Sequence, residues 1–164
     1  MHPFRRLSVW LKAHELTLAT YRVADAVSYR KFPGLGDQLR RAVMSIPTNI
    51  AEGTGRDTPE QFAYFLEIAI ASAHEVDYLL LLAADLDAIS KSDHAKLEAR
   101  TDVVARMLSA LRSTVRNRAM GRREGAKSVE RKSARSRRAD PAVHRLPSSA
   151  RTTAPAPAPP PTSA

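Results

Sequence analysis

The sequence has no cysteine among its 164 residues, which excludes disulfide bonds, thiolate metal ligands and a cysteine nucleophile. It has only six glycines and 5% aromatic residues, and neither a glycine-rich phosphate loop nor a Gly-x-Ser-x-Gly motif occurs. Its longest strongly apolar run, residues 78–84, is far shorter than the roughly 20 residues that a membrane-spanning helix needs. We therefore expect a soluble, cytoplasmic protein without a membrane partner, and find no sequence support for an enzyme.

The net charge of +9 is distributed unevenly along the chain. Residues 1–115 contain 14 basic and 14 acidic side chains, whereas residues 116–164 contain 12 basic and 3 acidic ones. The first part of the chain is therefore neutral, and the whole basic excess lies in the second part.

The composition changes at the same place. From Asn117 on there are no aromatic residues and few large aliphatic ones, and residues 152–164 are rich in alanine and proline. Such a segment buries too little apolar surface to offset the entropy lost on ordering. We predict a folded domain over 1–116 and a disordered tail over 117–164, first Arg-rich and then Ala/Pro-rich. A helical extension over 117–138, with its arginines neutralised by a polyanion, is the alternative.

Apolar residues recur at three- and four-residue steps through the first part, which predicts amphipathic helices. Ser8 is the expected cap of the first helix, and Thr58-Pro59 with Gln61 is a strong start signal for the third. The helices are expected over residues 8–31, 35–52, 59–88, and from Ser90 or Ser92 to about 116.

No period-two pattern predicts a strand, and short connections make consecutive helices antiparallel. The predicted fold class is therefore all-α. It is an antiparallel up-down-up-down four-helix bundle with a disordered, basic, Pro/Ala-rich C-terminal tail.

The second predicted helix contains a proline and ends in a glycine. Pro47 cannot donate to the carbonyl four residues earlier, so we expect a kink or break near Ser45. Gly53 is expected to form a left-handed C-cap. Asn49 and Glu52 suit hydrogen bonds that satisfy backbone groups freed by the proline and by the helix end, rather than catalysis. We interpret Pro47, Asn49, Glu52 and Gly53 as a structural motif.

The third predicted helix is apolar on more than one face. A helix of this kind is usually buried on more than one face. Because the chain supports only a moderate core, the simplest cover for the second face is another copy of the same protein. The predicted oligomer interface consists of Tyr64, Ile68, Ala71, Tyr78 and Leu82.

The same helix contains His74 close in sequence to Glu67, Glu75 and Asp77. Metal sites in helical bundles typically use Glu-x-x-His on one helix with partners of the same kind on others. The seven-residue spacing of Glu67 and His74 does not fit, and no second Glu-x-x-His occurs. We predict no metal, no cofactor and no catalytic residues.

Basic residues suggest nucleic-acid contact at two places. Arg40 and Arg41 could face a polyanion, although adjacent arginines on an amphipathic helix more often form a solvated edge or an intersubunit salt bridge. The cations of the tail could displace counterions from RNA or DNA in a salt-sensitive, poorly sequence-selective way. The other interpretation of the tail is a tolerated extension without function. Its candidate contacts are Arg118, Arg122, Arg123, Lys127, Arg131, Lys132, Arg135, Arg137 and Arg138.

Several segments resemble the bacterial four helix bundle protein family, also called S23 ribosomal protein-like and first noticed as products of intervening sequences in 23S rRNA genes. The resemblance covers about residues 4–115. It is carried by Leu7-Ser8-Val9-Trp10 with Lys12-Ala13, Gln38-Leu39-Arg40-Arg41-Ala42, Ser45-Ile46-Pro47-Thr48-Asn49-Ile50-Ala51-Glu52-Gly53 and Phe62-Ala63-Tyr64-Phe65-Leu66-Glu67-Ile68-Ala69.

The resemblance implies a bundle that assembles into a ring-shaped homopentamer. It also implies a relation to accessory proteins of diversity-generating retroelements, which bind a reverse transcriptase and nucleic acid. The chain departs from the family at Ala71-Ser72, where a glycine often precedes the serine, and the basic tail lies outside the resemblance. We predict a non-enzymatic, homo-oligomeric structural or adaptor protein; the alternative is a nucleic-acid-binding accessory protein associated with rRNA or a reverse transcriptase.

Overall fold

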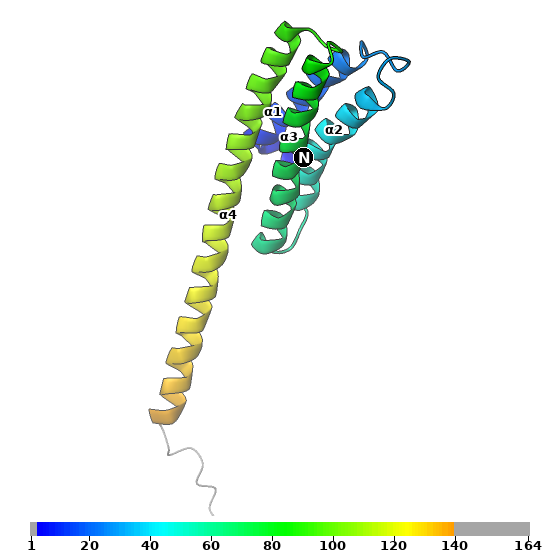
Figure 1. Cartoon of the computed structure of the whole chain (residues 1–164). Helices are drawn as coiled ribbons and strands as arrows, with labels where there is room; N and C mark the ends of the chain where they lie inside the picture. The colour runs from blue at the N-terminus through cyan, green and yellow to red at the C-terminus, as the bar shows by residue number, and fades with distance from the viewer. Residues whose placement is uncertain (1–2, 140–164) are drawn as a thin grey trace, which may run out of the picture. The chain divides into compact units, whose positions relative to one another are not determined.

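The computed structural model describes residues 3–139, with side chains up to residue 133. The chain divides into two units, Met1–Glu124 and Gly125–Ala164. The elements are the 3-10 helix η1 (Pro3–Arg6) and the α-helices α1 (Ser8–Ala24), α2 (Leu35–Gly53), α3 (Pro59–Asp85) and α4 (Lys91–Ala139) (Figure 1). All regular structure in the described residues is helical, and consecutive helices run in opposite directions. The predicted all-α, up-down bundle is confirmed.

One cluster of buried side chains joins all four α-helices of the first unit. On α4 the buried seam consists of Leu97, Val104, Leu108 and Val115. Thr101, the polar residue in this seam, is 2% exposed, and its hydroxyl donates to the carbonyl of Leu97 at 2.9 Å. That bond satisfies a hydroxyl that would otherwise be costly to bury. The largest fully buried aliphatic side chains are Leu16, Leu39, Ile46, Ile50, Leu66, Leu80 and Leu108.

The helix starts were predicted with mixed success. Thr58 caps α3 as expected, because its hydroxyl accepts from the backbone N–H of Gln61 at 3.2 Å. The hydroxyl of Ser90 likewise accepts from the N–H of Asp93 at 3.0 Å, which selects Ser90 over Ser92. Ser8 is the first residue of α1 rather than its cap; Leu7 occupies the cap position without a side-chain bond.

The first helix is shorter than predicted. It ends at Ala24, whereas the predicted helix continued to residue 31. Val27 is indeed buried, but in the connection after the helix, where its N–H donates to the carbonyl of Ala24 at 3.2 Å. Apolar periodicity therefore predicted the burial of Val27 correctly, but it predicted the wrong secondary structure for this residue.

Pro47 does not break α2, which runs as one helix from Leu35 to Gly53. The carbonyl that Pro47 leaves without its helical donor is that of Val43. It accepts from the hydroxyl of Thr17 on α1 at 3.2 Å. The same hydroxyl also lies 2.8 Å from the carbonyl of Ala13, so one proton is shared between the two carbonyls, and the neighbouring helix supplies part of the donor that the proline lacks. The predicted break near Ser45 is wrong, because α2 is one continuous helix.

Gly53 does not form a left-handed cap. It is the last residue of α2, and the capping residue Thr54 has a right-handed φ of −68°. A Cβ atom at Gly53 would lie 2.6 Å from Cδ2 of Phe62 and 2.9 Å from Cβ of Phe65. The glycine is therefore required for the close approach of α2 to α3, not for backbone conformation.

The fourth helix continues well past its predicted end near residue 116. Ala119 adds one more buried position after Val115, and α4 ends at Ala139. The structure assigns helix to residues 117–139, the range in which the alternative expected a helical extension. Residues 140–164 lie outside the described residues. Arginine, lysine, glutamate and alanine all favour helix. That local preference prevails over the scarcity of apolar side chains on which the prediction depended.

Candidate apolar and basic surfaces

The five predicted interface residues lie along the solvent side of α3. Tyr64 and Tyr78 are each 61% exposed, and Ala71 between them is also exposed. Ile68 and Leu82 are half-buried on the flank of the same stripe. Steps of four, three, seven and four residues keep all five on one helix face. We call these five residues the α3 stripe.

A polar contact separates the α3 stripe from the core. Ser72, the serine at the family departure, is 7% exposed, and its hydroxyl lies 2.8 Å from that of Ser45 on α2. Ser72 also donates to the carbonyl of Ile68 at 3.0 Å. The amide nitrogen of Asn49 donates to the carbonyl and the hydroxyl of Ser45 at 2.8 and 3.0 Å. This cluster ties α2 to α3, a link that no local sequence pattern indicated.

Glu52 does not play the part predicted for it. Its side chain is exposed and forms an ion pair with Arg56 at 4.0 Å, in place of a bond to freed backbone groups. Asn49 does bond to backbone, but to the carbonyl of Ser45 rather than to that of Val43, which Thr17 serves.

Arg40 and Arg41 are engaged within the chain. The guanidinium of Arg40 lies 2.6 Å from the Asp25 carboxylate and 2.8 Å from that of Asp37. The hydrogen bond to Asp25 is the main cause that raises the pKa of Arg40. Arg41 donates to the side-chain oxygen of Gln38 at 2.6 Å. Arg40 therefore links the residue that follows α1, Asp25, to α2. This contact within the chain was not among the predicted roles of Arg40.

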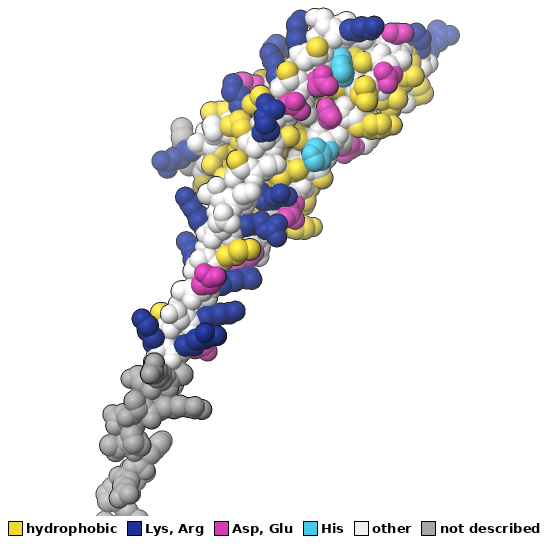
Figure 2. Space-filling model, turned by 60° about the vertical axis from the view of Figure 1, so that its left-hand side comes forward, with side chains coloured by type: hydrophobic (Ala, Val, Ile, Leu, Met, Phe, Trp, Pro, Cys, Tyr) yellow, Lys and Arg dark blue, Asp and Glu magenta, His cyan; other side chains and the backbone are white. Residues whose placement is uncertain are grey.

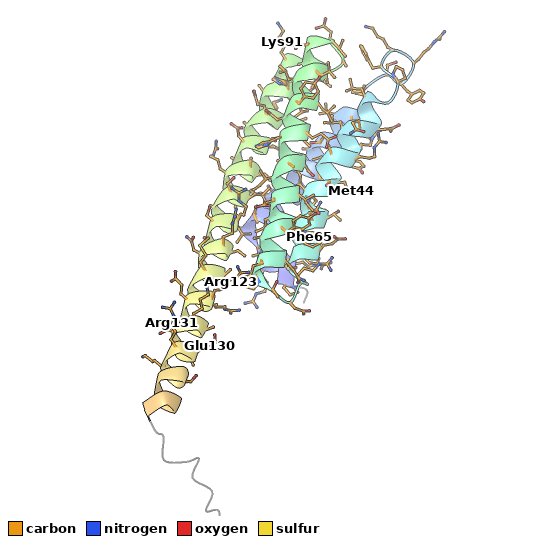
Figure 3. The ribbon with its side chains drawn as sticks, turned by 60° about the horizontal axis from the view of Figure 1, so that its bottom comes forward. Met44, Phe65, Lys91, Arg123, Glu130 and Arg131 are labelled. Carbon is orange, nitrogen blue, oxygen red and sulfur yellow. The ribbon has the colours of Figure 1, made fainter. Side chains whose placement is uncertain are left out.

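The four arginines between residues 116 and 123 of α4 fall into two pairs. Arg116 binds Glu67 at 3.3 Å and Arg123 binds Glu60 at 3.0 Å, both on α3. Figure 3 shows Arg123 beside the first turns of α3. Arg118 and Arg122 are exposed and have no ion pair or hydrogen bond with any described residue. The sequence alone indicated a single array of cations, whereas in the structure Arg116 and Arg123 are neutralised and Arg118 and Arg122 are not.

In the second unit, the side chains of Lys127, Arg131 and Lys132 are exposed on α4. Figure 2 shows Lys and Arg side chains projecting from this helix as it nears the grey residues. The side chains of Arg135, Arg137 and Arg138 lie outside the described part of the chain.

A cavity of about 400 Å³ lies at the end of the bundle in the first unit. Arg56 from the α2–α3 connection lines it together with Arg118 and Arg122 from α4, and Asp57 is the one acidic residue in its lining. Leu7, Phe62, Leu111 and Val115 provide its apolar wall. Because Arg56 and Arg118 are far apart in the sequence, their meeting was not predictable from spacing.

Within residues 3–139, no group of three or more metal-binding side chains is placed so that it could hold a metal ion. No helix in the same residues is both long and apolar enough to cross a membrane.

Comparisons with known proteins agree with the resemblance. A crystal structure of a protein of unknown function from the S23 ribosomal protein family, from Bacteroides thetaiotaomicron VPI-5482, is similar with a TM-score of 0.59. The similarity covers 63% of this chain and 96% of that chain, and at 22% identity it shows the fold alone. No curated protein matches. The family model described as 23S rRNA-intervening sequence protein matches residues 5–110. The chain therefore belongs to the 23S rRNA-intervening sequence protein family.

Proposed function

We propose that this protein is a non-enzymatic, homo-oligomeric helical bundle that acts as a cytoplasmic structural or adaptor protein. Five copies is the number implied by the family resemblance. The observation that carries the proposal is the α3 stripe, since two tyrosines on one helix face are each 61% exposed. Single exposed apolar residues are ordinary, whereas several on one helix face favour an interaction surface.

A second copy of the chain is the occupant we propose for this surface. The stripe has the three- and four-residue spacing that lets helices pack along a seam. Two tyrosines supply only a fraction of the roughly 800 Å² per partner that a stable interface buries. Ile68, Leu82 and a facing surface must therefore contribute.

A ring needs that facing surface to be a different part of the same chain, whereas a two-fold dimer uses one surface twice. Leu11 and Leu18 on α1 are each 48% exposed and lie seven residues apart, on one helix face. They support a ring in which the α3 stripe of one copy packs against α1 of the next.

Replacement of Tyr78 by glutamate tests the interface. Because Tyr78 is exposed in the single chain, we expect Tyr78→Glu to fold normally and to weaken association at least about tenfold, since assembly would bury an unpaired charge. Light scattering after gel filtration measures the mass. Leu82→Glu should act in the same direction.

Tyr29→Glu is the matched control, because Tyr29 is 71% exposed and lies outside the stripe. It should leave the mass unchanged. An assembled wild type whose mass Tyr78→Glu does not change would contradict the proposed interface. Leu18→Glu then separates the two symmetries, since it dissociates a ring through α1 and spares a dimer through α3 alone.

The second candidate is a nucleic-acid-binding accessory protein, associated with rRNA or a reverse transcriptase. The observation that favours it is the unpaired state of Arg118 and Arg122, in contrast to Arg116 and Arg123. Binding of RNA and duplex DNA by the full chain across a salt series tests this function. A steep loss of affinity with salt is expected for contacts to phosphates.

A further inference from the structure

Arg118 and Arg122 on α4 form no ion pair with any described residue, and both line the cavity of about 400 Å³. They lie four residues apart on one helix face, with Thr114 one turn before them in the same lining. Arg116 and Arg123, in the same two turns, are bound by glutamates of α3. The two arginines without an ion pair, Arg118 and Arg122, therefore line the same cavity.

Arg56, from the connection between α2 and α3, lines the same cavity. It lies 4.5 Å from the centre of the Phe65 ring, and its ion pair with Glu52 has a length of 4.0 Å with both side chains about half exposed. An exposed pair of this length neutralises little charge. The aromatic contact positions Arg56 without consuming its hydrogen-bonding capacity.

The apolar wall beside these cations is rigid. Phe62 lines the cavity and packs against Gly53 so closely that a single added carbon at Gly53 would lie 2.6 Å from its ring. Leu111 and Val115 continue the wall on α4. The lining thus combines three arginines, one aspartate and an apolar surface around about 400 Å³. That volume lies in the range of small-ligand pockets.

We propose that this cavity binds the phosphate group of a nucleotide, either free or within a nucleic-acid strand, through Arg56, Arg118 and Arg122. Guanidinium groups bind phosphate oxygens in pairs of parallel hydrogen bonds. The apolar wall is placed to cover the sugar and base. For a strand, this inference rests on the nucleic-acid function proposed above; for a free nucleotide, it goes beyond that function.

The probes are AMP and a single-stranded RNA of about ten nucleotides, titrated into the full chain by calorimetry at moderate salt. The double variant Arg118→Gln/Arg122→Gln should lower affinity at least about tenfold, because hydrogen bonds to charged groups are among the strongest that proteins make. Arg116→Gln/Arg123→Gln removes the same charge from the same helix turns and should change affinity less than about twofold.

A second pair of variants tests the cavity without touching an arginine. Thr114→Glu places a carboxylate in the cavity lining and should weaken binding as strongly as the double variant. Ser113→Glu adds the same charge at the adjacent exposed position outside the lining and should have little effect. Circular dichroism checks that all four variants keep the helical fold.

Each outcome decides the proposal. AMP binding with this pattern assigns the cavity to a free nucleotide, and RNA binding alone with this pattern assigns it to a strand. An equal loss of affinity in the two arginine double variants overturns the proposed cavity site, because binding then depends on overall charge. The nucleic-acid function still stands in that case. No binding of either probe overturns the cavity, and the duplex DNA titration described above then decides the nucleic-acid function.

Discussion

α2 and α4 each contain a feature that argues against a regular helix, and each is helical for a different reason. In α2 the obstacle is Pro47, and Thr17 on α1 supplies the donor that Val43 would otherwise lack. In α4 the obstacle is a scarcity of apolar residues after Val115, yet the helix continues to Ala139. α2 depends on its neighbours, whereas the end of α4 depends on the local preferences of its own residues. Substitutions in the two helices should therefore differ in size and even in sign.

The largest effect is expected for Gly53→Ala in α2. The added Cβ would approach Phe62 to 2.6 Å and Phe65 to 2.9 Å, so the α2–α3 contact must open. We expect a loss of about 2–3 kcal/mol in the free energy of unfolding, as for other overpacked interiors. Urea denaturation followed by circular dichroism measures it. A loss below about 0.5 kcal/mol would show that α2 and α3 adjust freely.

A smaller loss is expected when the donor to Val43 is removed. Thr17→Val keeps the shape of the side chain but leaves the carbonyl of Val43 without its hydroxyl donor. An unsatisfied buried acceptor costs about 1–2 kcal/mol in the free energy of unfolding. Urea denaturation provides the measurement.

Pro47→Ala supplies the control for this substitution, because alanine restores the backbone N–H that can reach Val43. In a Pro47→Ala background, Thr17→Val should cost clearly less than in the natural sequence. Additive effects of the two changes would mean that Thr17 and Pro47 are not coupled through this carbonyl.

The features that were predictable from the sequence are those with a local pattern. The periodic seam of α4, the Thr58 cap and the exposed stripe from Tyr64 to Leu82 follow from three- and four-residue spacing or from capping chemistry. For the motif around Pro47, the predicted hydrogen-bond partners and the predicted role of Gly53 were wrong, because both depend on contacts with α1 and α3.

The features that were not predictable join residues distant in the chain. Arg40 contacts Asp25 and Ser45 contacts Ser72 only because helices pack, and for the same reason Arg56 and Arg118 line one cavity. No spacing rule connects such positions, so Arg40 and Arg118 were both predicted as candidate nucleic-acid contacts. The structure separates them by the acidic groups that each one meets.

The smallest effect, of opposite sign to that of Gly53→Ala, is expected for Gly121→Ala in α4. A Cβ atom at Gly121 would have no neighbour within 4 Å, so nothing opposes the gain in helix preference. Alanine in place of an exposed helical glycine stabilises a helix by about 0.5–1 kcal/mol.

Because the effect is local, slower hydrogen exchange of the amides around residue 121 measures it better than global unfolding does. If this segment were disordered, as its composition first indicated, exchange would remain fast in both forms. A change in exchange confined to this segment would show that the end of α4 is helical through its own residues, while α2 is helical through its neighbours.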